Sequence, residues 1–149
     1  MSKPSFSLSF PLWLAGLLQT GLYYSRLPER MGSHFDITGQ VDAWVEKPLF
    51  FITYLCVLCL ILGLPEMFQW VMESFPGFYG RNVDLARIRK QCQLFSVATA
   101  CFALAVAHLV YSANLSRQLR LSVPGIWVIL ILYILFMIGW GRATVKAFR

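Results

Sequence analysis

The sequence predicts an all-α, polytopic membrane protein: a four-transmembrane-helix bundle with an ordered outer loop between helices 1 and 2. Two observations lead to this prediction. Of 149 residues, 58% are hydrophobic and only 13% are charged, whereas a soluble domain of this length needs more polar surface. Four apolar stretches also approach the roughly 20 residues that a helix needs to cross a bilayer core of about 30 Å.

The predicted spans lie within a single membrane domain, residues 1–149, and cover about 5–24, 48–67, 92–113 and 122–141. Pro11 is compatible with the first span, because a proline in the first turn removes no internal hydrogen bond. A signal peptide is the alternative for this segment. Residues 17–26 (LLQTGLYYSR) lack the small-x-small cleavage pattern, so we expect a retained span.

The third span is rich in small residues, whereas the fourth carries bulky Ile and Leu on all faces. Two pairs in the third span have small-x-x-x-small spacing: Ser96 with Ala100 and Ala103 with Ala107. This spacing lets helix backbones approach closely in lipid. We therefore expect the third span at the bundle centre and the fourth more exposed to lipid.

The basic residues predict the orientation in the membrane. Eight Lys and Arg lie in the termini and the loop at residues 68–91, and five lie in the loops at residues 25–47 and 114–121. The positive-inside bias then places both termini and residues 68–91 in the cytoplasm and residues 25–47 outside the cytoplasmic (inner) membrane. The net charge of +6 is spread between apolar runs, which favours contact with the lipid bilayer and argues against nucleic acid.

The outer loop, residues 25–47, concentrates the polar chemistry of the chain. It holds four of the seven acidic residues and one of the two histidines. A plain helical hairpin needs only a few connecting residues, so this length requires a reason. In an extended strand His34, Asp36 and Thr38 would point one way and Phe35 and Ile37 the other.

The end of the outer loop is predicted to form the first helical turns of the second span. On such a helix Asp42 is the N-cap or a first-turn acid, and Trp44 lies at the membrane interface. Asp42 and Glu46 would then share a helix face at i,i+4 spacing.

Three interpretations of the loop side chains are open. They can form an ion-paired structural lid or recognition surface, or an acid/base pair for catalysis. They can also bind a divalent cation through His34, Asp36 and Asp42, although the spacing matches no known metal signature. No other cofactor is predicted.

The stretch LPERMGSHFDITGQVDAWVEK, residues 27–47, resembles the signature of a bacterial membrane domain of unknown function found at the N-terminus of SdpI-type immunity proteins. That signature is Leu-Pro, a few residues, Ile-Pro-x-His-Phe-Asn, a turn ending in Gly, and Asp-x-Trp/Tyr-x-x-Lys. The matching residues are Leu27, Pro28, His34, Phe35, Gly39, Asp42, Trp44 and Lys47. Gly32 stands where the family usually has Pro, which we expect to loosen the loop, and Asp36 stands where it usually has Asn.

The resemblance implies a helical protein of the cytoplasmic membrane and no enzyme activity. SdpI-type members protect the producing cell from a secreted peptide toxin and take part in signalling its presence. We therefore expect a non-enzymatic, immunity-like or receptor-like accessory protein that recognises a peptide or membrane-protein partner through the outer loop. A homo-oligomer and a subunit of a larger complex both fit this expectation.

His108 provides a second functional candidate, a membrane enzyme or transporter-like protein that uses an outer-leaflet His/Asp site. It lies about 8 Å inside the third span by helix rise, in the same leaflet as the outer loop. An ionisable residue within a span is a functional candidate. Either a neutral His108 is hydrogen-bonded to a neighbour, or it lines an outward-facing polar cavity with Gln19 and Thr53.

The cysteines raise a third candidate, a thiol oxidoreductase similar to the DsbB-like enzymes. Cys56 and Cys59 form a Cys-x-x-Cys pair, but they lie roughly 12 and 16 Å inside the second span by helix rise. An exchanging dithiol must reach the outer face. We therefore expect buried free thiols that act as small apolar residues.

Overall fold

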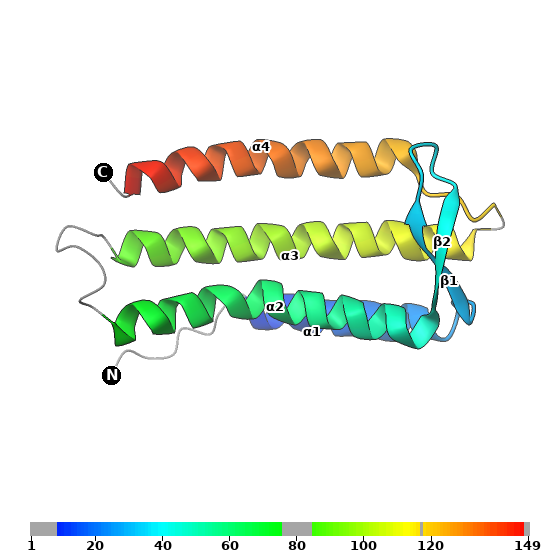
Figure 1. The fold of residues 1–149 in the computed structure, drawn as a ribbon, viewed down its shortest axis with the longest axis horizontal. Helices are drawn as coiled ribbons and strands as arrows, with labels where there is room; N and C mark the ends of the chain where they lie inside the picture. The colour runs from blue at the N-terminus through cyan, green and yellow to red at the C-terminus, as the bar shows by residue number, and fades with distance from the viewer. Residues whose placement is uncertain (1–8, 76–84, 117, 148–149) are drawn as a thin grey trace.

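The computed structural model describes residues 9–75, 85–116 and 118–147. Figure 1 shows the helices lying alongside one another, with a β-hairpin across one end. The elements are α1 (Ser9–Tyr24), β1 (Arg30–Phe35), β2 (Val41–Glu46), α2 (Lys47–Ser74), α3 (Leu85–Leu115) and α4 (Val123–Ala147). The described chain is mostly helical, as predicted, but the two-stranded sheet means that it is not purely α.

Three of these helices are long and apolar enough to cross a membrane. The qualifying segments are Lys47–Leu64, Ala86–Leu115 and Val123–Val145, with mean hydropathies of 2.1, 2.0 and 2.3. The protein is therefore a multi-pass membrane protein. Helix α1 has 16 described residues, which is about 24 Å of helix, and the start of the predicted first span lies outside the described residues. A fourth span stays a prediction.

Helix α3 is the centre of the described bundle, as predicted. It packs against α1, α2, α4 and β1, whereas α4 packs against α3 alone among the described elements. Ser96 and Ala100 are buried, and the Ser96 hydroxyl donates a hydrogen bond of 2.9 Å to the carbonyl of Ile61. None of the apolar segment of α4 is buried by the described protein, so α4 is more exposed than α3, as predicted.

The best-buried cluster lies at the hairpin end and joins the hairpin to three helices. Its members are Leu27, Met31, Phe51, Ala107 and Tyr111. The rings of Tyr23 and Phe51 pack on Tyr111 with centroid distances of 4.9 and 5.5 Å. Burial of these side chains fastens the hairpin to the bundle.

Residues 41–46 form a strand, so the prediction that they begin the second span was wrong. Val41, Trp44 and Val45 are residue types that favour strands, and the pairing with β1 overrides any helical preference. Glu46 occupies the N-cap position of α2 without a side-chain capping bond, and Pro48 lies in the first turn. Asp42 is therefore neither a cap nor a helical neighbour of Glu46.

The helices extend further than the predicted spans at the end away from the hairpin. Helix α2 continues to Ser74 and α3 begins at Leu85, so both ends of the predicted loop 68–91 are helical. Residues 67–74 are rich in Met, Gln and Glu, which are strong helix formers. Residues 76–84 of the predicted loop lie outside the described residues.

Candidate functional site: the hairpin between α1 and α2

The hairpin reverses direction through a turn at residues 36–39 that is organised by Asp36. The amide of Gly39 donates to the carbonyl of Asp36 at 2.9 Å. The Asp36 carboxylate accepts from the amide and hydroxyl of Thr38 and from the amide of Gln40, at 2.7–2.9 Å. Aspartate at the first turn position favours such side-chain-to-backbone bonds. The predicted extended strand therefore ends at Phe35, and Asp36 and Thr38 belong to the turn.

The hydrogen bonds of this turn also lower the pKa of Asp36. The largest effect comes from the Thr38 hydroxyl, and the backbone amides, Gln40 first, contribute in the same direction. Hydrogen bonds to a carboxylate favour its charged form. Asp36 is therefore a turn-forming anion.

His34 and Asp42 meet across the hairpin, with 2.5 Å between His34 Nδ1 and Asp42 Oδ1. A β-bulge makes this possible: His34 pairs with Ala43 and Phe35 with Val41, which leaves Asp42 between paired positions. The two side chains are 71% and 47% exposed. An exposed pair of this kind contributes roughly 0–1 kcal/mol to stability. Its main effect is to hold the two side chains together on the hairpin surface.

Asn114, in the last turn of α3, attaches the middle of the hairpin to the bundle. Its Oδ1 accepts from the amide of Gly32 at 2.7 Å. Its Nδ2 donates to the carbonyls of Gly32 and Val110 at 3.0 and 2.9 Å. The side chain is buried and completes the backbone hydrogen bonding of β1 as a neighbouring strand would.

Sequence reasoning did not identify this role of Asn114. The chain reads Asn-Leu-Ser from this position, a glycosylation sequon that is common by chance. The useful signal was a single Asn at the end of an apolar span, since a polar group there needs a partner within the protein.

Gly32 tightens the loop, contrary to the expectation that it loosens it. Its amide is the donor to Asn114, a bond that the proline of the family pattern cannot make. A Cβ at this position would lie 2.6 Å from Cγ2 of Val41. The contact with Asn114 therefore requires a residue other than the proline of the family pattern at position 32.

The tip of the hairpin is attached to the linker between α3 and α4. The amide of Leu121 donates to the carbonyl of Gly39 at 2.8 Å, and Arg120 Nε donates to the carbonyl of Thr38 at 3.0 Å. Gly39 has a φ of +82°, and a Cβ there would lie 2.5 Å from the carbonyl oxygen of Leu121. Glycine is thus required by both conformation and space.

The base of the hairpin is closed by Lys47, a predicted binding residue. Its Nζ donates to the carbonyl of Leu27 at 3.1 Å and to Glu29 Oε1 at 2.9 Å. It also lies 5.0 Å from the ring centroid of Tyr24, and the residue is only 7% exposed. This lysine fastens the ends of the hairpin and does not present its charge outward.

The outward surface of the hairpin combines a polar pair with apolar side chains. Ile37 at the tip is 92% exposed and Trp44 is 45% exposed, while Phe35 is partly covered. With the exposed side chains of His34 and Asp42, the hairpin therefore presents both apolar and polar groups on a fixed backbone. Such surfaces are typical of recognition sites.

The three predicted metal ligands are only partly brought together. His34 contacts Asp42, but Asp36 is used by its own turn. Within residues 9–75, 85–116 and 118–147, no group of three His, Cys, Asp or Glu side chains is placed to hold a metal ion. A divalent cation at these residues stays a prediction.

The polar residues predicted to line a cavity below the loop are engaged separately. Gln19 donates to the carbonyl of Leu104 at 3.0 Å and accepts from the hydroxyl of Tyr54 at 3.0 Å. His108 Nδ1 lies 3.0 Å from the hydroxyl of Tyr23. Thr53 lines a different, mainly apolar groove. Gln19 and His108 are therefore each hydrogen-bonded to a neighbouring group, which for His108 is the first of the two arrangements considered from the sequence.

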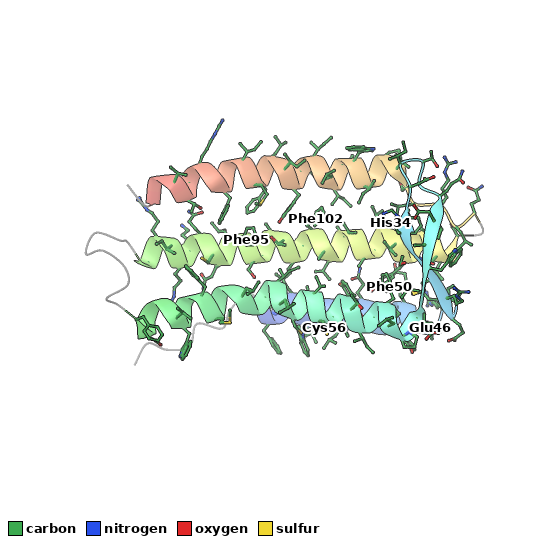
Figure 2. The ribbon with its side chains drawn as sticks, viewed as in Figure 1. His34, Glu46, Phe50, Cys56, Phe95 and Phe102 are labelled. Carbon is green, nitrogen blue, oxygen red and sulfur yellow. The ribbon has the colours of Figure 1, made fainter. Side chains whose placement is uncertain are left out.

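All four cysteines are free, but three of them are exposed at the bundle surface. Cys56 lies on α2 away from α3 (Figure 2), and Cys59 Sγ accepts from Trp13 Nε1 at 3.1 Å. Cys56, Cys59 and Cys101 therefore lie on the outside of the bundle and are not covered by protein. A helix in lipid can direct small apolar side chains outward, so position within a span does not imply burial by protein.

The hairpin and its flanking helices are the segment with a recognisable relationship to other proteins. Residues 12–60 match a domain of unknown function, DUF1648. The DUF1648 match runs from α1 through the hairpin into α2, and it contains the motif at residues 27–47. No curated protein and no solved structure matches the chain. The match shows a domain of unknown function at residues 12–60 and leaves the SdpI-type relationship as a proposal.

Proposed function

We propose that the protein is a non-enzymatic, immunity-like or receptor-like membrane protein that recognises a partner through its β1–β2 hairpin. The observation that carries this proposal is the attachment of the hairpin at its base, middle and tip by Lys47, Asn114 and Leu121. These contacts hold an exposed surface in one conformation. A preorganised surface loses less conformational entropy when it binds.

The proposed partner is a peptide or a membrane protein at the outer surface of the cytoplasmic membrane. The excess of Lys and Arg on the other side supports an outward-facing hairpin. Ile37 and Trp44 supply apolar contacts, and the exposed His34–Asp42 pair supplies polar ones. A partner with an amphipathic surface would complement both.

Site-specific photocrosslinking in the producing cell tests this proposal. A photoreactive amino acid at Ile37 should yield a discrete adduct with one peptide or membrane protein, identified by mass spectrometry. The matched control is the same amino acid at Val128, which is 57% exposed on α4 and should not yield that adduct. Lipid adducts alone at both positions would contradict recognition by the hairpin.

A further inference from the structure

A groove with a volume of about 570 Å³ lies below the hairpin, between α2 and α3. Its size is within the range of roughly 300–1,000 Å³ typical of small-molecule sites. Ser33 and Val45 of the hairpin line one end, and Tyr133 of α4, which is hydrogen-bonded to Thr99, lines the other. In Figure 2, Phe50 lies between α2 and α3 near the hairpin, where the groove begins.

The length of the groove matches one leaflet of a bilayer. Its wall runs from Phe50 to Ile61 on α2 and from Val110 back to Thr99 on α3. At 1.5 Å per residue, each wall is about 17 Å long. Half of a hydrocarbon core of about 30 Å is about 15 Å. The groove is therefore about as long as one leaflet is thick, so with the hairpin at the membrane surface it would reach to about the bilayer centre.

The lining of the groove suits a long apolar ligand with one polar group near the hairpin. Most of the wall is aliphatic or aromatic, with Val57 on α2 facing Ala103 and Val106 on α3. At the deep end the hydroxyls of Thr99 and Tyr133 bond to each other at 2.8 Å. Thr53, nearer the hairpin, has no hydrogen-bond partner for its hydroxyl among the described residues and is free to donate to a ligand.

We propose that this groove binds one acyl chain of a lipid from the hairpin-side leaflet, with the Thr53 hydroxyl donating to an ester carbonyl. A partner transmembrane helix fits less well. Such a helix needs the full core of about 30 Å, whereas the walls of the groove are only about 17 Å long. The site is open sideways, because α2 and α4 do not pack against each other in the described chain. This inference is independent of the hairpin's partner.

The test is photolabelling of the purified full chain in nanodiscs that contain a phosphatidylcholine with a diazirine in its acyl chain. Labelled peptides should concentrate on the walls around Val57 and Ala103. Ala103→Phe fills the groove and should remove this concentration. The matched control, Ala105→Phe, lies in the adjoining depression between α3 and α4; Ala105 does not line the groove, so this change should leave the labelling of the groove in place.

Each outcome decides between alternatives. If Ala103→Phe fails to fold, Val57→Trp blocks the opposite wall and should give the same loss. Equal labelling of all lipid-facing helix surfaces would mean annular lipid only and would overturn the proposal. A crosslink between two copies of the chain at this groove would also overturn it, because the occupant would then be protein.

Discussion

At the scale of single residues, Asn114 does the most to position the candidate site. One amide side chain satisfies both backbone groups of Gly32 and the carbonyl of Val110. The two groups of Gly32 are buried, so loss of the amide leaves them without partners, which is more costly than the gain from forming the bonds. The carbonyl of Val110 keeps its bond within helix α3. The position of the hairpin therefore depends on a residue outside the family motif.

Asn114→Ala should lower the free energy of unfolding by about 1–3 kcal/mol, the usual cost of leaving buried polar groups unsatisfied. Denaturation of the purified protein in detergent measures this change. Asn114→Asp keeps the acceptor for Gly32 but loses both donated bonds, so it should also destabilise. Ser112→Ala, at an exposed position two residues earlier, is the control and should have little effect. Equal stability of Asn114→Ala and Ser112→Ala would refute this role.

Asp36 gives the turn a pH dependence whose direction follows from its lowered pKa. Its ordinary pKa is 3.8, and the Thr38 hydroxyl and turn amides lower it in the folded protein. The extra stability of the turn is therefore fully present above pH 3.8 and is lost as the pH falls through the lower, folded pKa. The amide resonances of Thr38 and Gln40 should shift below pH 3.8 in an NMR titration. Asp36→Asn keeps an acceptor but cannot titrate, so these shifts should disappear.

At the scale of elements, the hairpin is an insertion that depends on the helices for its stability. A two-stranded hairpin is only marginally stable in water on its own. Here Met31 is fully buried against the helices, and Lys47 joins the two ends of the insertion. The strands and the helix ends should therefore unfold together.

Lys47→Met tests the closure of the hairpin base. The methionine keeps most of the apolar volume but leaves the carbonyl of Leu27 without its donor, so we expect a loss of about 1–3 kcal/mol. Glu29→Gln should cost much less, because the Glu29 side chain is 86% exposed and exposed ion pairs contribute roughly 0–1 kcal/mol. Thermal unfolding in detergent compares the two variants. A larger effect of Glu29→Gln would show that the ion pair, and not the carbonyl contact, closes the base.

At the scale of the whole molecule, the helices run side by side with the hairpin at one end and the end of α4 at the other (Figure 1). The orientation proposal therefore predicts that the two ends of the bundle differ in their accessibility from outside the cell. Ile37 lies at the hairpin tip and Val145 near the end of α4, and both are exposed.

Single-cysteine labelling in intact cells tests the orientation, using a chain without its four native cysteines. A membrane-impermeant maleimide should label Ile37→Cys directly and Val145→Cys only after the membrane is permeabilised, because the positive-inside bias predicts an external hairpin. The reverse pattern would place the hairpin in the cytoplasm and contradict the proposed site of recognition.

Composition and hydropathy were sufficient to predict a helical membrane protein and the positions of its apolar helices. Long uninterrupted apolar segments satisfy their backbone internally only as helices when water is absent. The small residues at Ser96 and Ala100 likewise predicted the central position of α3, because close approach in lipid requires them. The motif at residues 27–47 predicted the segment that matches DUF1648.

The tertiary structure decided how the polar side chains are used. Val41–Glu46 became a strand because β1 was present to pair with it, and Lys47 and Asp36 were used within the hairpin. Asn114 is hydrogen-bonded to Gly32 although 82 residues separate them. Hydrophobic pattern is local to an element, but hydrogen-bond partners depend on the three-dimensional arrangement. Only the assembled helix ends could therefore show which polar residues are bonded within the protein and which are exposed.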